Sequence, residues 1–140
     1  MSIKAIPLLI LSLIVYNAIV FLGVGDQPPH MIFGEELFSL PMPNGGSWVF
    51  QLGDLMLMVG LILLAIEVIK ATYTRGSGLA DQALSMFLFV IFLIEFLLVP
   101  KASTSIFFLL TLMSAIDVVA GAIVGIRTAR RDFGFGTDVS

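Results

Sequence analysis

Four long apolar segments constrain what this sequence can fold into. They cover residues 5–24, 48–69, 83–100 and 103–126, and a helix needs about 20 residues to cross a bilayer. Hydrophobic residues make up 59% of the 140-residue chain, and its mean hydropathy is +1.09, which exceeds what a soluble core of this size needs. The sequence therefore predicts one all-α domain, an integral membrane four-helix bundle.

The connections between these segments differ in length. Residues 25–47 form a long first loop and residues 70–82 a shorter second one, whereas only Lys101 and Ala102 separate the last two segments. Because this connection is so short, the third and fourth helices are expected to form an antiparallel hairpin.

The basic residues predict the orientation, because Lys and Arg near helix ends stay preferentially in the cytoplasm. Only Lys101 lies on one side of the predicted bundle, and the other side carries Lys4, Lys70, Arg75, Arg127, Arg130 and Arg131. We expect a multi-pass protein of the bacterial inner (cytoplasmic) membrane, with both termini cytoplasmic and the long loop outside. Arg130 and Arg131 are expected to bind anionic lipid headgroups, ahead of a flexible tail at 132–140.

The long outer loop contains a β-hairpin pattern. An alternating stretch at Phe38, Leu40 and Met42 precedes an Asn-Gly-Gly turn, and Trp48 and Phe50 alternate after it. Two prolines confine the first strand to a sheet edge, because proline has no N–H to donate. The loop is expected to form an amphipathic cap on the outer membrane surface, with a substrate-gripping lid as the alternative. The tryptophan also suits an interfacial position at the start of the second helix.

Three polar residues fall at a similar depth inside the predicted helices. Counting about 1.5 Å per residue from the outer helix ends places Asn17, Asp54 and Glu95 roughly 7–10 Å deep. Because a carboxylate facing lipid costs several kcal/mol, we expect these side chains to turn inward and meet. Glu95 then either binds a proton or ligand or pairs with Lys101 as a structural contact. Further hydrogen-bond partners are expected among Tyr16, Gln51 and Ser105.

Asp117 is the deepest acid, about 14 Å along the helix from Arg127 and near the bilayer midplane, where no basic residue is expected. It shares a stripe of small and polar positions with Ser114, Gly121 and Gly125. The GxxxG spacing of the glycines permits close helix contact, so this stripe is expected to be the main packing surface, within the chain or to a partner. The acid either fixes helix register or carries a proton.

Glu67 lies three residues from Lys70, near the cytoplasmic end of the second predicted helix. Long charged side chains at such positions reach toward the interface and pair there. We therefore expect an interfacial ion pair of Glu67 with Lys70, Arg75 or Arg127.

The composition excludes several classes of chemistry. The chain has no cysteine and a single histidine, so it offers neither thiol chemistry nor a multi-histidine metal site. It also lacks HExxH, GxSxG and phosphate-binding glycine loops. We therefore expect no enzymatic activity, no metal, no cofactor and no nucleic-acid partner.

The segments GDLMLMVGLILLAIEVIKAT, LIEFLLVP and LMSAIDVVAGAIVGIRTARRD resemble a group of short, uncharacterised four-span bacterial inner-membrane proteins. The resemblance covers the second to fourth helices and implies no activity. Small multidrug transporters have a similar length, but their essential glutamate lies in the first helix, where this chain has Asn17.

Two functions remain open on the sequence. The first is a non-enzymatic accessory or scaffold subunit that associates through its helix faces, as a homo-oligomer or within a larger membrane complex. The second is a small proton- or cation-coupled transporter or channel that uses the intramembrane carboxylates. A weaker third is the binding of a quinone or lipid between helices, at Met56, Met58, Met86 and Phe92.

Overall fold

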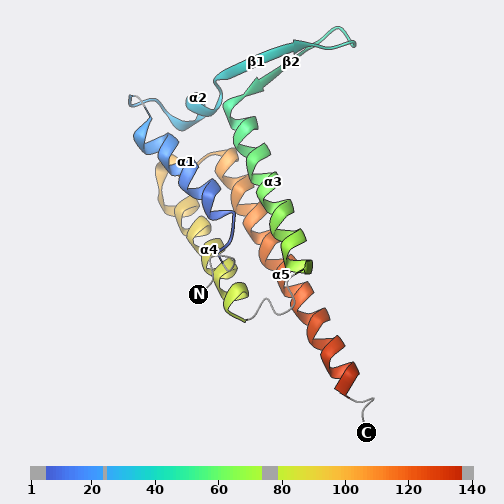
Figure 1. Ribbon diagram of the computed structural model, residues 1–140. Helices are drawn as coiled ribbons and strands as arrows, with labels where there is room; N and C mark the ends of the chain where they lie inside the picture. Colours follow the sequence, from blue (N-terminus) through green and yellow to red (C-terminus); the bar gives the residue numbers. More distant parts are fainter. Residues whose placement is uncertain (1–5, 24, 74–78, 137–140) are drawn as a thin grey trace.

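The computed structural model describes residues 6–23, 25–73 and 79–136, which form a mostly helical chain with one small sheet (Figure 1). The elements run in order α1, α2, β1, β2, α3, α4, a 3-10 turn at Pro100–Ala102, and α5. Their bounds are α1 Ile10–Leu22, α2 Pro29–Phe33, β1 Glu36–Pro41, β2 Ser47–Gln51, α3 Leu52–Tyr73, α4 Leu79–Leu98 and α5 Ser105–Gly136.

Among the described residues, three helices are long and apolar enough to cross a membrane, namely α3, α4 and residues 105–127 of α5. The segment predicted as a first span, 5–24, instead contains the 13-residue α1. At about 1.5 Å per residue α1 measures about 20 Å, short of a hydrocarbon core of about 30 Å. It starts late because the chain from Pro7 to Leu9 forms a tight turn, in which Pro7 accepts a hydrogen bond from the N–H of Ile10.

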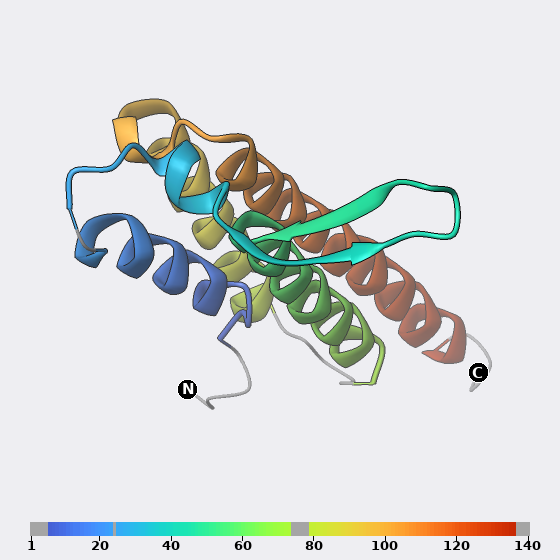
Figure 2. The ribbon, with the colours of Figure 1, turned by 90° about the horizontal axis from the view of Figure 1, so that it is seen from above.

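The first loop contains an antiparallel β-hairpin, as the alternating pattern predicts (Figure 1). Phe38 pairs with Phe50 and Leu40 with Trp48, and a bulge lies between Glu36 and Phe38. The turn needs its glycines, since Gly45 has φ 86°, a conformation that other residues rarely adopt. The second helix was predicted to begin at residue 48, but residues 48–51 pair as strand β2, and α3 starts only at Leu52. Seen from above, the hairpin extends from the end of α3, away from α1 (Figure 2).

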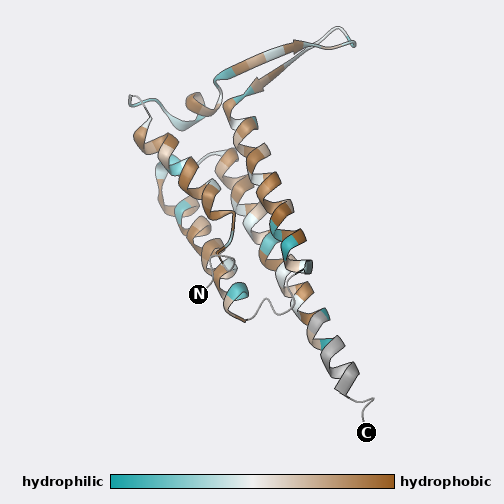
Figure 3. Cartoon of the chain, in the orientation of Figure 1, coloured by the Kyte–Doolittle hydropathy of each residue, from teal (hydrophilic) through white to brown (hydrophobic). Residues whose placement is uncertain are grey.

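Helix α5 packs against both α3 and α4, so its inward face forms the centre of the core. Phe107 and Leu110 on this face are fully buried, together with Phe92 of α4 and Tyr16 of α1. Tyr16 and Phe107 meet edge to face, with ring centroids 4.8 Å apart. The helix surfaces are largely hydrophobic, as a bilayer environment requires (Figure 3).

Helix α5 runs past the other helices at the end of the bundle opposite the hairpin (Figure 1). It continues to Gly136, so residues 132–136, which were predicted to be a flexible tail, are helical; residues 137–140 lie outside the described part. Residues 127–136 contain no proline, and the Ala and Arg residues at 127–131 favour helix, so nothing local ends α5 at the basic cluster.

Candidate functional site

Polar contacts gather around α1, and the Asn17–Glu95 pair is the one that the sequence predicts. The Asn17 side-chain amide donates to Glu95 Oε2 at 3.2 Å and to the Leu13 carbonyl at 2.9 Å. Glu95 lies on α4 and is half-buried. The contact therefore joins α1 to α4 inside the apolar part of the bundle, and it gives the glutamate a structural partner there.

Asp54 does not join this pair, in contrast to the prediction. It is the third residue of α3, and its carboxylate accepts the backbone N–H of Gln51 at 2.9 Å. This is the reach-back contact by which an acid at the start of a helix satisfies a free backbone donor. Asp54 therefore caps α3 at its junction with β2.

Tyr16 joins α1 to the connection between α4 and α5. Its hydroxyl donates to the Lys101 carbonyl at 2.9 Å and shares a hydrogen bond with Thr104 Oγ1 at 2.7 Å. The Thr104 oxygen also accepts the N–H of Phe107 at 3.1 Å, so it caps the start of α5. A buried tyrosine needs such partners for its polar end. Sequence reasoning named Tyr16 as a hydrogen-bond partner for the acids, but the described hydrogen bonds of its hydroxyl are to this connection.

Lys101 was predicted as a counter-charge for Glu95, and within the described residues no salt bridge joins them. Its ammonium group donates to the Val20 carbonyl at 3.3 Å and lies 4.9 Å from the centre of the Phe21 ring. The carbonyl groups in the last turn of a helix lack internal partners and carry partial negative charge. Lys101 therefore stabilises the C-terminal end of α1.

Glu67 holds the turn that leads into α1, at the end of this helix opposite Lys101. Its Oε1 accepts the backbone N–H of Leu8 at 2.7 Å and lies 3.6 Å from the ammonium nitrogen of Lys70. The predicted ion pair with Lys70 is therefore present, whereas Arg127 is exposed and takes no part in the described salt bridge. The third predicted partner, Arg75, lies outside the described residues. Glu67 is only 9% exposed, so it is more buried than an interfacial acid would be. The hydrophilic positions near the far end of α3 are visible in Figure 3.

Asp117 is buried on α5 and interacts with residues of two other helices. Its carboxylate lies near Ser85 of α4 and within electrostatic range of Glu67 and Lys70 of α3. Lys70, which the sequence places near the cytoplasmic end of α3, thus acts electrostatically on Asp117. The predicted depth of Asp117 in the membrane stays a prediction. Three helices thus contribute to one group of polar side chains, which we call the Asp117 cluster: Glu67, Lys70, Ser85 and Asp117.

The predicted packing stripe of α5 is only partly used within the chain. Ser114 is almost fully buried. A Cβ added at Gly121 would lie 2.6 Å from the Gln82 side-chain oxygen, but one at Gly125 would meet no atom within 4 Å. The close approach of α3 to α5 occurs elsewhere, at Gly60, where a Cβ would lie 2.8 Å from Leu110.

Two further sets of predicted residues can be placed. The basic residues Arg127 and Arg130 are exposed at the end of α5, and the side chain of Arg131 lies outside the described part of the chain. The apolar set does not share one surface, because two of its members are buried and two are exposed: Met56 and Phe92 lie in the core, and Met58 and Met86 face outward. This division argues against a common quinone site at these four positions.

Comparison with known proteins finds no matching family model, no matching curated protein and no matching solved structure.

Proposed function

We propose that this chain is a non-enzymatic membrane protein, an accessory or scaffold subunit that associates through its helix faces. The observation that carries the proposal is the use made of the interior polar groups. Glu67 binds one end of α1, Lys101 binds the other, and Glu95 binds its middle through Asn17. Groups engaged in fixed structural contacts suit a rigid assembly element better than a path along which ions move.

The outward face of α5 is the best candidate for association. A shallow apolar depression of about 480 Å³ lies along it, lined by Leu112, Ala115, Ile116, Val119, Ala120 and Ile123. Small residues such as Ala115 and Ala120 let a second helix approach closely, which is how helices associate in lipid. The unused glycine Gly125 follows two residues beyond this surface. We propose a second copy of the chain, or a helix of a larger membrane complex, as the partner.

Proton- or cation-coupled transport is the second candidate, and the Asp117 cluster supports it. Its acids come from α3 and α5 and influence each other electrostatically. A carboxyl group buried in a membrane bundle is a common element of proton relays. Under this alternative, Asp117 would gain and release a proton during each transport cycle.

One paired experiment separates the two candidates. Ala120→Leu fills the depression on α5, and Asp117→Asn preserves shape but cannot release a proton. Assembly is measured by single-molecule photobleaching in bilayers, and flux by a pH-gradient assay in proteoliposomes. Ala83→Leu, at an exposed position of α4, is the matched control for the added volume.

The proposed function predicts that Ala120→Leu reduces assembly at least tenfold, equivalent to about 1.4 kcal/mol, and that Ala83→Leu and Asp117→Asn do not. Robust wild-type flux that disappears in Asp117→Asn would establish transport instead. Equal assembly of all variants would refute association through this face of α5.

A further inference from the structure

The hairpin formed by β1 and β2 has two chemically different faces. Because paired residues and alternate positions share a face, the register puts four large apolar side chains together: Phe38, Leu40, Trp48 and Phe50. The opposite face carries smaller or more polar side chains: Ser39, Pro41, Ser47 and Val49. The hairpin is therefore amphipathic, and we call its two sides the aromatic face and the polar face.

The aromatic face is organised but uncovered. Phe38 stacks on Phe50 with centroids 4.8 Å apart and planes 15° apart, and Trp48 meets Phe50 edge to face at 5.6 Å. Phe38 and Trp48 nevertheless remain 45% and 47% exposed. These rings pack on one another, and no other part of the described chain shields them. So much clustered aromatic surface indicates an apolar neighbour outside the chain.

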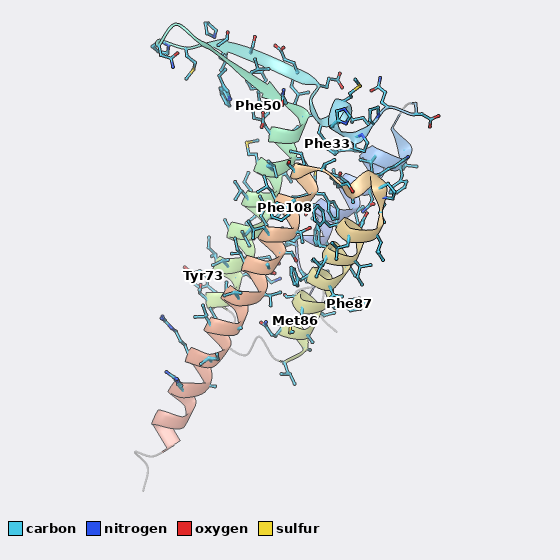
Figure 4. The ribbon with its side chains drawn as sticks, turned by 180° about the vertical axis from the view of Figure 1, so that it is seen from behind. Phe33, Phe50, Tyr73, Met86, Phe87 and Phe108 are labelled. Carbon is cyan, nitrogen blue, oxygen red and sulfur yellow. The ribbon has the colours of Figure 1, made fainter. Side chains whose placement is uncertain are left out.

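The position of the hairpin shows what that neighbour is. Strand β2 ends at Gln51 and α3, a helix of membrane-spanning length, begins at the next residue. The hairpin extends sideways from this end of α3 (Figure 1). Figure 4 shows Phe50 on the side of the hairpin toward the helices, and Phe50 shares that side with the rest of the aromatic face. The aromatic face therefore lies on the side of the hairpin toward the helices, next to the start of α3.

We infer that the hairpin lies on the surface of the bilayer that α3 crosses, with its aromatic face in the headgroup region and its polar face in water. Aromatic rings, tryptophan above all, prefer this depth, because they have both apolar surface and a polar edge. This inference does not depend on the proposed accessory function, since it concerns the lipid rather than a protein partner.

Trp48 is the only tryptophan in the chain, so its fluorescence reports on this face alone when it is excited selectively. The full chain is placed in phosphatidylcholine nanodiscs, which leave both membrane surfaces accessible. We expect blue-shifted emission, weak quenching by iodide, and strong quenching by lipids brominated near the headgroup end of the acyl chains. Lipids brominated near the chain ends should quench less.

The matched control moves the indole to the other face in the double variant Trp48→Phe, Val49→Trp. Its emission should shift to the red, with strong iodide quenching and little quenching by brominated lipid. Because the chain has no cysteine, Leu40→Cys and Ser39→Cys provide an independent pair. A water-soluble maleimide should label Ser39→Cys several times faster than Leu40→Cys.

Several results would overturn the inference. Red-shifted, iodide-accessible emission from wild-type Trp48 would mean that the hairpin stands in water. Protection from iodide without quenching by brominated lipid would mean that a second copy of the chain covers the aromatic face. Equal labelling of the two cysteine variants would mean that the two faces share one environment.

Discussion

The contact between Glu67 and the start of α1 gives the most direct test of how the bundle is held together. The carboxylate accepts the Leu8 N–H at 2.7 Å, a charge-assisted hydrogen bond that joins residues 59 positions apart. Replacing Glu67 by Leu removes the acceptor and leaves this N–H without its partner. Replacing it by Gln keeps an acceptor oxygen and removes only the charge.

The sizes of the two effects follow from these contacts. A hydrogen bond to a charged group contributes about 1.5–3 kcal/mol, and the salt bridge with the 30% exposed Lys70 side chain adds little after solvent screening. We expect Glu67→Leu to weaken the docking of α1 by about 2–3 kcal/mol. We expect Glu67→Gln to weaken it by about 1 kcal/mol, because a neutral hydrogen bond remains.

A buried thiol can measure this docking. Ser12 faces the core and is fully buried, so Ser12→Cys should react with a thiol reagent only when α1 detaches. The labelling rate should rise roughly 30- to 150-fold with Glu67→Leu and roughly fivefold with Glu67→Gln. Glu36→Gln, on the exposed strand β1, is the charge-matched control and should leave the rate unchanged. Equal rates in all four backgrounds would show that Glu67 does not hold α1.

Two further changes test the packing and the opposite end of α1, both by equilibrium unfolding in mixed micelles. Gly60→Ala should destabilise the bundle by about 1–3 kcal/mol, because its new methyl group would press on the buried Leu110. Gly125→Ala, which has open space around it, should be neutral or slightly stabilising, and a similar loss at both glycines would contradict this difference. Lys101→Met should cost about 1 kcal/mol by removing the donor to the Val20 carbonyl; an unchanged stability would mean that this contact contributes nothing.

The three long helices could be predicted from the sequence because the length and apolarity of a segment directly reflect the thickness of a bilayer. The hairpin could be predicted because alternation and an Asn-Gly-Gly turn are local features. The membrane orientation, the location of the termini and the resemblance to four-span bacterial proteins stay predictions.

The wrong prediction for Asp54 follows from a wrong prediction of where its helix starts. The depth of each polar residue was counted along its helix from the predicted outer end. This count correctly brought Asn17 and Glu95 together, because α1 and α4 are regular helices around these two residues. Asp54 was placed with them because the second helix was taken to begin at residue 48. Strand β2 occupies residues 48–51, so Asp54 lies in the first turn of α3 and caps it.

The contacts of Glu67 could not be predicted, because they depend on a tight turn at Pro7 and on tertiary packing.

The sequence analysis also missed Gly60, the glycine at which α3 and α5 approach closely. The GxxxG motif drew attention to Gly121 and Gly125, whereas Gly53 and Gly60 lie seven residues apart on the face of α3 that meets α5. Their positions match one face of a helix, and this spacing is the signal that was available.

The tethering of α1 also has a consequence for the order in which the protein is made. Helix α1 leaves the ribosome first, yet the side chains that hold its two ends and its middle are Glu67, Glu95 and Lys101, which are synthesised much later. It is also too short to cross the hydrocarbon core alone. The final position of α1 can therefore be set only after the α4–α5 connection has been synthesised. The first helix to be made is thus the last to dock in the bundle.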